Sequence, residues 1–217
     1  MIGGKKVYKF LIMLVQLCII SSLIAQQKVI IPDLTKIKNS KMWVINNREA
    51  MISEYVHLDA KPGDGFLMTQ EPIFANGKIE LDIRGKDQRG RSFVGVAFHG
   101  LNDSTFDAVY FRPFNFKNPD NKGHSVQYVA QPEFPWYDLR RDHPQKYENG
   151  VTPVPEPDDW FHVTIQVNFP TVQVFVNHSK KASLTVEQLS SRKKGWIGFW
   201  VGNNSEGDFK NLKIIPD

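Results

Sequence analysis

Six segments of the sequence alternate bulky apolar side chains with polar or small ones, and this pattern constrains the fold more than any other feature. The segments cover residues 78–84, 92–99, 107–113, 160–168, 171–177 and 196–202. Because successive side chains of a β-strand point to opposite faces, this alternation indicates strands that each bury one face. No segment keeps a helical period for long, and we expect short helical turns only near residues 137–145 and 186–192.

The segments between these strands have turn compositions, rich in Gly, Asn and Asp, as in "ANG", "GLNDST" and "NNSEG". Many short antiparallel strands in one domain predict an all-β fold, with two sheets packed face to face as a jelly-roll sandwich. Shorter strands are expected in "EYVHLD" and "GFLMTQ". The side chains expected to fill the space between the sheets are Ile79, Leu81, Ile83, Val94, Val96, Phe98, Val109, Phe111, Phe161, Val163, Ile165, Val167, Ile197, Phe199 and Val201.

The first 25 residues are typical of a secretory signal peptide. Lys5, Lys6 and Lys9 precede an apolar run that ends at Ala25, and this run of about 16 residues is shorter than the roughly 20 that a membrane-spanning helix needs. We therefore expect cleavage and export to the periplasm or the extracellular space. The expected organisation is a signal peptide over residues 1–25 and a single β-sandwich domain over residues 26–217, with no membrane span after cleavage.

Removal of the signal peptide changes both the cysteine content and the charge. The single cysteine, Cys18, lies in that segment, so the remaining chain has no disulfide. The net charge of +4 falls to +1 once the three lysines are removed, which leaves no strongly basic surface for nucleic acid or an anionic membrane.

The faces that point away from the core suggest a shallow groove. Keeping the same parity along each strand, the outward residues are Glu80, Asp82 and Arg84; Gly95, Ala97 and His99; Ala108, Tyr110 and Arg112; and Trp196, Gly198 and Trp200. If several of these strands share a sheet, small residues form a floor with polar and aromatic groups around it. Such a surface suits a sugar, whose C–H face packs on aromatic rings while its hydroxyls bond to planar polar groups.

Trp200 and Trp196 are the candidate stacking platforms, although both could instead pack beneath the long connection. Arg112 and His99 are candidates for contact with a ligand because Gly95 and its small neighbours leave space above them. Glu80 and Asp82 are further candidates for ligand binding, with an ordinary solvated face and cross-strand ion pairs as the alternative.

The long connection from Asn115 to Asp159 is expected to carry function, because loops on a rigid β scaffold commonly do. Its segment "HSVQYVAQPEFPWYDLR" could wall one side of the groove and close one end. The residues expected there are His124, Gln127, Tyr128, Gln131, Trp136, Tyr137, Arg140 and Arg141.

The sequence has no Gly-rich phosphate-binding loop, no nucleophile elbow and no pair of residues at the spacing of zinc ligands. We expect no cofactor and no catalytic metal. A structural calcium ion is conceivable at "NPDNKG" or "NNSEGD", where oxygen donors gather in a turn, although neither matches a defined calcium loop.

The succession "FANGKIELDIRG", "RSFVGVAFHG", "DAVYFRPFNF", "WFHVTIQV", "VQVFVN", "GWIGFWVGN" and "GDFKNLKI" resembles a concanavalin A-like lectin/glucanase domain. It is most similar to exported bacterial domains grouped with 3-keto-disaccharide hydrolases and related to glycoside hydrolase family 16. The resemblance covers about residues 43–215 and implies a jelly roll whose concave face binds or cleaves glycans.

The sequence departs from glycoside hydrolase family 16 at the catalytic strand. That family carries a Glu, an Asp and a second Glu on one strand, with the two glutamates as nucleophile and acid/base. Glu80 and Asp82 have the first spacing, but Ile83, Arg84, Gly85 and Lys86 follow and the second glutamate is missing.

Three functions stay open. The first is an exported glycan-binding domain with a carbohydrate partner, and the ligand-binding candidates are His99, Tyr110, Arg112, Gln127, Trp136, Trp196, Trp200, Glu80 and Asp82. The second is a glycoside hydrolase or polysaccharide lyase in the same groove, with His99 or Tyr110 as general acid or base and Arg112 neutralising negative charge. The third is a structural envelope or adhesion module whose groove is filled by its own loop.

Overall fold

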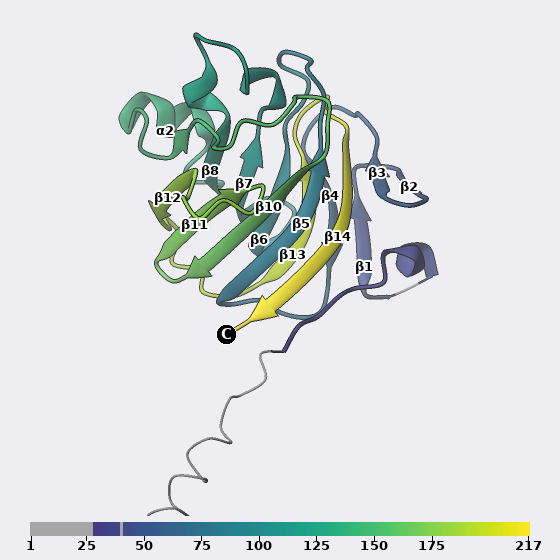
Figure 1. Ribbon diagram of the computed structural model, residues 1–217. Helices are drawn as coiled ribbons and strands as arrows, with labels where there is room; N and C mark the ends of the chain where they lie inside the picture. The colour runs from purple at the N-terminus through teal and green to yellow at the C-terminus, as the bar shows by residue number, and fades with distance from the viewer. Residues whose placement is uncertain (1–27, 40) are drawn as a thin grey trace, which may run out of the picture.

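The computed structural model describes residues 28–39 and 41–217, which form two antiparallel seven-stranded sheets packed face to face (Figure 1). The predicted signal peptide, which includes Cys18, lies outside the described residues. The first sheet has the strand order β1 (Trp43–Asn46), β4 (Gly65–Thr69), β13 (Trp196–Val201), β6 (Val94–Asn102), β7 (Thr105–Phe111), β8 (Val126–Gln131) and β9 (Glu148–Asn149). The second has the order β12 (Leu184–Glu187), β11 (Thr171–Val176), β10 (Phe161–Asn168), β5 (Gly77–Arg84), β14 (Gly207–Pro216), β3 (Val56–Leu58) and β2 (Ala50–Ile52).

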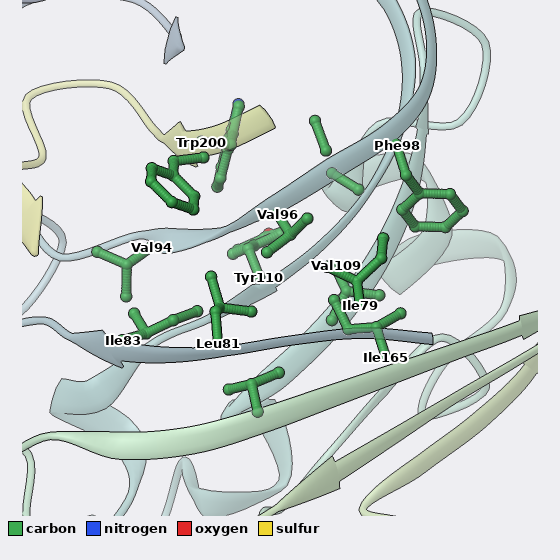
Figure 2. Close-up of a cluster of buried hydrophobic side chains, with 14 of the residues drawn as sticks. Ile79, Leu81, Ile83, Val94, Val96, Phe98, Val109, Tyr110, Ile165 and Trp200 are labelled. Carbon is green, nitrogen blue, oxygen red and sulfur yellow. The ribbon is translucent and has the colours of Figure 1, made fainter. Parts of the chain in front are cut away.

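The core lies between the two sheets, where the alternating strands meet. Strand β5 alternates fully between buried and half-buried side chains, and Ile79, Leu81 and Ile83 have no exposed surface. Figure 2 shows these side chains lying opposite Val94 and Val109 of the first sheet. Burying each such side chain contributes roughly 1.5–3 kcal/mol. The predicted all-β jelly-roll sandwich is therefore confirmed.

In the part of the chain that the structure describes, helical structure is confined to short segments. The α-helix α2 (Trp136–Asp142) begins after Pro135 and lies beside β8 at one end of the sheets (Figure 1). The 3-10 helices are η1 (Leu34–Asn39), η2 (Pro113–Asn115) and η3 (Lys122–His124). Within the described residues, no helix is both long and apolar enough to cross a membrane.

The two helical turns predicted from the sequence have different outcomes. The turn near residues 137–145 is confirmed by α2. The prediction of a helical turn near residues 186–192 is wrong, because Leu184–Glu187 forms β12 and pairs with residues 171–174 of β11. The strands expected in "EYVHLD" and "GFLMTQ" are present as β3 and β4.

Candidate functional site

A groove crosses the outer face of the first sheet, the face that points away from the core. It consists of two cavities of about 330 Å³ and 270 Å³ that share Phe93 and Trp136 as lining residues. The first is also lined by Arg89, Gly90, Arg112, Phe114, Asn115, Asn121, His124 and Arg140. The second is also lined by Asp64, Tyr110, Val129, Gln131, Pro135, Tyr137, Trp200, Gly202 and Asn203.

The floor of the groove is aromatic. The rings of Tyr110 and Trp200 lie 4.9 Å apart between centroids, with their planes at 53°. Both residues are strand partners of Gly95, which lies between them. A Cβ atom on Gly95 would come within 2.6 Å of the Tyr110 Cα, so the close approach of the strands requires a glycine. The bare face of β6 therefore lies beneath aromatic rings of the chain itself.

Arg112 lies at the end of β7 and is held from several sides. Its Nη1 donates to the carbonyl oxygen of His124 at 3.0 Å, and its Nη2 donates to the Tyr110 hydroxyl at 2.6 Å and to Oε1 of Gln127. Nη1 also lies 3.6 Å from Oε2 of Glu148. Only 4% of Arg112 is exposed, and burial lowers the pKa of its guanidinium. These contacts fix the orientation of the guanidinium.

Glu148 joins three basic side chains at the base of the groove. Arg140 donates to both of its carboxylate oxygens, from Nε at 2.9 Å and from Nη2 at 2.6 Å, and Nδ1 of His124 lies 2.8 Å from Oε1. Burial would raise the pKa of Glu148, but the hydrogen bonds and charges of Arg140 and His124 outweigh it and the pKa is lowered. We call Arg112, Glu148, Arg140 and His124 the Arg112 cluster.

Tyr110 and Gln127 connect the aromatic floor to this cluster. They face each other across β7 and β8, and the Tyr110 hydroxyl donates to Oε1 of Gln127 at 3.1 Å. Burial raises the pKa of Tyr110 to about 12. Tyr110 is therefore a neutral hydrogen-bonding group near neutral pH.

Trp136 forms the exposed wall of the groove. It is the first residue of α2, and 44% of it is exposed. The guanidinium of Arg140 lies 5.1 Å from the centroid of the Trp136 ring. The backbone carbonyl of Trp136 accepts a 3.4 Å hydrogen bond from Nε2 of Gln127. The indole is thus anchored by its backbone and one cation–π contact while part of the ring faces solvent.

Asp64 is a carboxylate of the groove that the alternation pattern did not reveal. Burial raises its pKa, and this effect is partly offset by Trp200 and the charge of Arg48. The Trp200 Nε1 is buried and makes no hydrogen bond of ordinary geometry. Asp64 and Trp200 therefore lie beside each other in the lining of the second cavity, and the indole N–H offsets part of the effect of burial on the carboxyl.

Comparison with known proteins identifies the family. Residues 34–215 match the family model described as the 3-keto-alpha-glucoside-1,2-lyase-like domain. The chain belongs to this family. The comparison with curated proteins gave no match.

Solved structures share the fold of this lyase-like domain. A carbohydrate-binding module, CBM66 from Bacillus subtilis, is 16% identical, with 81% of this chain and 96% of that chain covered and a TM-score of 0.59. A Bacillus subtilis protein of unknown function with a galectin-like fold is 15% identical, with coverages of 84% and 91% and a TM-score of 0.58. The exoplasmic/lumenal domain of VIP36, bound to Ca²⁺ and Man3GlcNAc, is 11% identical, with coverages of 79% and 82% and a TM-score of 0.54.

The groove of the lyase-like domain brings together Tyr110, Arg112, Gln127, Trp136 and Trp200, five of the residues singled out from the sequence. The role of each in ligand binding stays a prediction. Four further residues that the sequence placed in the long connection beside the groove also line it: His124, Gln131, Tyr137 and Arg140. The sequence did not single out Asp64, Arg89 and Phe93, which line the groove as well.

His99 does not lie in the groove, contrary to the prediction from its parity. The pairing of β6 with β7 shifts between Phe98 and Asn102, and His99 has a positive φ of 51°. Its Nε2 donates to the carbonyl oxygen of Ala75 at 2.7 Å, and its Nδ1 lies 3.1 Å from Nε2 of Gln188. The residue is fully buried, and burial lowers the pKa of its imidazole. The β-bulge thus places His99 in a structural network.

Glu80 and Asp82 also lie away from the groove, because β5 belongs to the second sheet. Asp82 accepts a hydrogen bond from Asn211 at 2.6 Å and lies 2.8 Å from Nδ1 of His162. Strand parity gives the outward faces of both sheets but not which strands share a sheet. The contacts of Asp82 fit the alternative given for this strand, an ordinary outer face with polar pairs between neighbouring strands.

Trp196 lines a different cavity on the first sheet, near the turn between β6 and β7. Trp196 and Trp200 therefore do not form one platform.

Among residues 28–39 and 41–217, no three or more His, Cys, Asp and Glu side chains are arranged to hold a metal ion. The structural calcium ion considered for the two turns stays a prediction.

Proposed function

We propose that this domain binds a carbohydrate in the groove between Trp136 and the Arg112 cluster. The observation that carries the proposal is the partly exposed indole of Trp136 beside the fixed guanidinium of Arg112, whose centre lies 6.0 Å from the Trp136 ring centroid. A pyranose can pack its C–H face on an indole while its hydroxyls bond to charged and amide groups at its edge.

The groove offers these polar partners at both ends. Arg89, Asn115 and Asn121 line the cavity near the Arg112 cluster, and Asp64 and Gln131 line the cavity near Trp200. The side chains of the Arg112 cluster are already held in place by internal hydrogen bonds. Binding of a ligand there therefore costs less conformational entropy of the protein. The fold shared with a carbohydrate-binding module and with a domain that holds Man3GlcNAc supports the same proposal.

We also propose that the chain is exported, as the first 25 residues predict. A polysaccharide ligand is consistent with a location outside the cytoplasm. Amino-terminal sequencing of the protein from the periplasm and the culture medium would detect the cleavage.

The experiment that tests carbohydrate binding is a glycan-array screen with the chain from residue 26 onward. Each hit is followed by calorimetric titration and by analysis of the products after long incubation. Saturable binding without new reducing ends or unsaturated products is the result we expect. Absence of saturable binding to any glycan would contradict the proposal and favour a structural module.

A second candidate function is the elimination reaction named in the family description. The observation that favours it is the ion pair of His124 with Glu148, whose Nδ1 and Oε1 atoms lie 2.8 Å apart at the base of the groove. The contact lacks the geometry of an ordinary hydrogen bond. A carboxylate beside Nδ1 favours a proton on that nitrogen and leaves Nε2 to accept another.

The chemistry of a 1,2-elimination from a 3-keto glucoside assigns a role to each group. The ketone at C3 acidifies the hydrogen on C2, and Nε2 of His124 would remove that proton. The C2–H bonding pair forms the C1=C2 double bond as the C1–O bond breaks. The departing oxygen keeps that bonding pair and takes up a proton. Arg112 and Arg140 would stabilise negative charge that develops on the C3 oxygen.

The test of this second function is incubation with a 3-keto glucoside and detection of the unsaturated sugar by its ultraviolet absorbance. A His124→Gln variant is expected to lose at least about a hundredfold in rate, as is typical for a general base. A His143→Gln variant serves as the control, since His143 is exposed and lines none of the cavities described above. Wild-type turnover by the His124 variant would exclude that residue as the base.

A further inference from the structure

A cavity larger than either part of the groove lies apart from it, at the end of the first sheet where β6 turns into β7. Its volume is about 710 Å³, within the range of 300–1,000 Å³ that is usual for ligand pockets. Its lining includes Trp196 and the polar residues Asn46, Gln70, Asn102, Asp103 and Lys194. None of these residues lines the groove.

Trp196 supplies an aromatic wall that is held in a fixed position. Its indole lies against Gly100, where an added Cβ atom would come within 2.0 Å of the ring. Phe66 packs edge-on to the ring with centroids 5.7 Å apart, and Phe106 lies at 6.2 Å. Trp196 is still partly exposed. A rigid, partly exposed indole is a platform on which a sugar ring can stack.

Polar groups surround this indole at the rim. Nδ2 of Asn46 donates to Oδ2 of Asp103 at 3.1 Å, which joins β1 to the β6–β7 turn. Gln70 and Asn102 add amide groups, and Lys194 contributes one positive charge that balances the carboxylate of Asp103. Amide and carboxylate side chains are the planar partners that sugar hydroxyls require.

The charge balance distinguishes this cavity from the groove. The groove holds Arg89, Arg112, Arg140 and a single paired Glu148 near one end, whereas Asp103 and Lys194 offset each other here. Leu101 and Ile73 are 63% and 57% exposed and add apolar surface around the opening. A neutral ligand that presents both C–H faces and hydroxyls matches this surface.

We infer that this cavity is a second saccharide site, which binds a neutral sugar unit on Trp196 with Asn46 and Asp103 as hydrogen-bonding partners. The inference rests on the proposed function for the class of ligand, but on different residues. Because both sites lie on the outer face of one sheet, a polysaccharide that reaches both gains avidity over a short oligosaccharide.

The test is a titration followed by NMR of the indole N–H groups of the five tryptophans. The probes are the neutral tetrasaccharides of glucose, mannose and xylose, and Trp→Phe variants assign each signal. Trp196 reports on the second site, while Trp136 and Trp200 report on the groove. We expect a saturable shift of the Trp196 signal with at least one tetrasaccharide.

A variant carrying Asn46→Ala and Asp103→Ala provides the second measurement, because both side chains lie at the rim and the Trp196 platform is left intact. We expect it to weaken the Trp196 response at least about tenfold while the Trp136 and Trp200 responses stay unchanged. Glu187→Ala, an exposed carboxylate on the second sheet, is the control.

Two results would overturn the second site: no Trp196 shift with any of the tetrasaccharides, or a Trp196 response that the rim variant retains. Shifts confined to Trp136 and Trp200 would support the groove and refute the second site. A shift confined to Trp196 would support the second site and contradict the groove.

Discussion

The guanidinium of Arg112 lies 3.6 Å from the carboxylate of Glu148, and both side chains are almost completely buried beneath the groove. A buried charge pair keeps its position only if its other polar atoms are also satisfied. Here Tyr110, Gln127 and Arg140 supply those partners. The groove is therefore built on a rigid polar base, with Trp136 as its more exposed wall.

Arg112→Ala is expected to destabilise the domain by about 3 kcal/mol, because it removes a buried cation and leaves its partners unpaired. From the sequence alone, Arg112 would be an exposed groove residue whose loss leaves the melting temperature nearly unchanged. Denaturant unfolding of Arg112→Ala beside Arg89→Ala, at another arginine of the groove, measures the difference. Equal stability of the two variants would show that the buried cluster does not support the fold.

Asp64→Asn is expected to stabilise the domain by about 1 kcal/mol near neutral pH, as functional-site carboxylates commonly cost stability. Burial raises the pKa of Asp64, so the folded state favours the protonated form. The stabilisation should shrink as the pH falls through the raised pKa and Asp64 in the wild-type protein takes up its proton. Thermal unfolding at neutral and acidic pH measures this, with the exposed Asp120→Asn as control. A pH-independent gain would contradict the account.

His99→Asn tests the buried imidazole. Burial lowers the pKa of His99, so the unfolded chain binds the proton more readily than the folded protein. The contribution of His99 to stability is therefore full above its ordinary pKa of 6.5 and is lost as the pH falls below that value. The difference in unfolding free energy between the wild type and His99→Asn should be larger at about pH 8 than at about pH 5. These two pH values span the range in which a histidine ordinarily titrates. An Asn tolerates the positive φ at this position.

The measurement for His99 is denaturant unfolding at the two pH values, with the exposed His143→Asn as control. A constant difference would mean that His99 does not titrate between the folded and unfolded states. Saccharide binding by His99→Asn should match the wild type, since the residue lies outside the groove.

Gly95→Ala is expected to destabilise the domain by about 2 kcal/mol, within the range for overpacking a tightly packed position. The added Cβ atom would meet the Tyr110 Cα at 2.6 Å, whereas a Cβ atom on Gly123 would meet nothing within 4 Å. Gly123→Ala is therefore the matched control. If the two variants unfolded at the same denaturant concentration, the close packing of Tyr110 over Gly95 would be refuted.

Strand parity predicted the core from sequence because each alternating segment buries one face, as Leu81 and Val96 show. It also placed Tyr110 and Trp200 on one outer face. It could not place His99, because a bulge in β6 breaks the alternation. Asp82 was misplaced for another reason: strand pairing between distant segments is set by the topology and not by the local pattern.

The polar groups of the groove were harder to predict than its floor. Asp64 precedes a strand and Glu148 lies in a two-residue strand, so neither belongs to an alternating segment. Their significance comes from contacts with residues far along the chain, such as the His124 and Arg140 pairs of Glu148. Such contacts depend on the path of the long connection, which a local pattern does not determine.

The most direct test of carbohydrate binding in the groove is calorimetric titration of Trp136→Ala with the best glycan from the array screen. Trp160→Ala is the control, since Trp160 packs on Arg84 and Lys210 at the second sheet. The account predicts that Trp136→Ala weakens binding at least about tenfold, the effect of losing an aromatic anchor, while Trp160→Ala binds like the wild type. Wild-type affinity in Trp136→Ala would show that the glycan is bound elsewhere and would contradict the central claim.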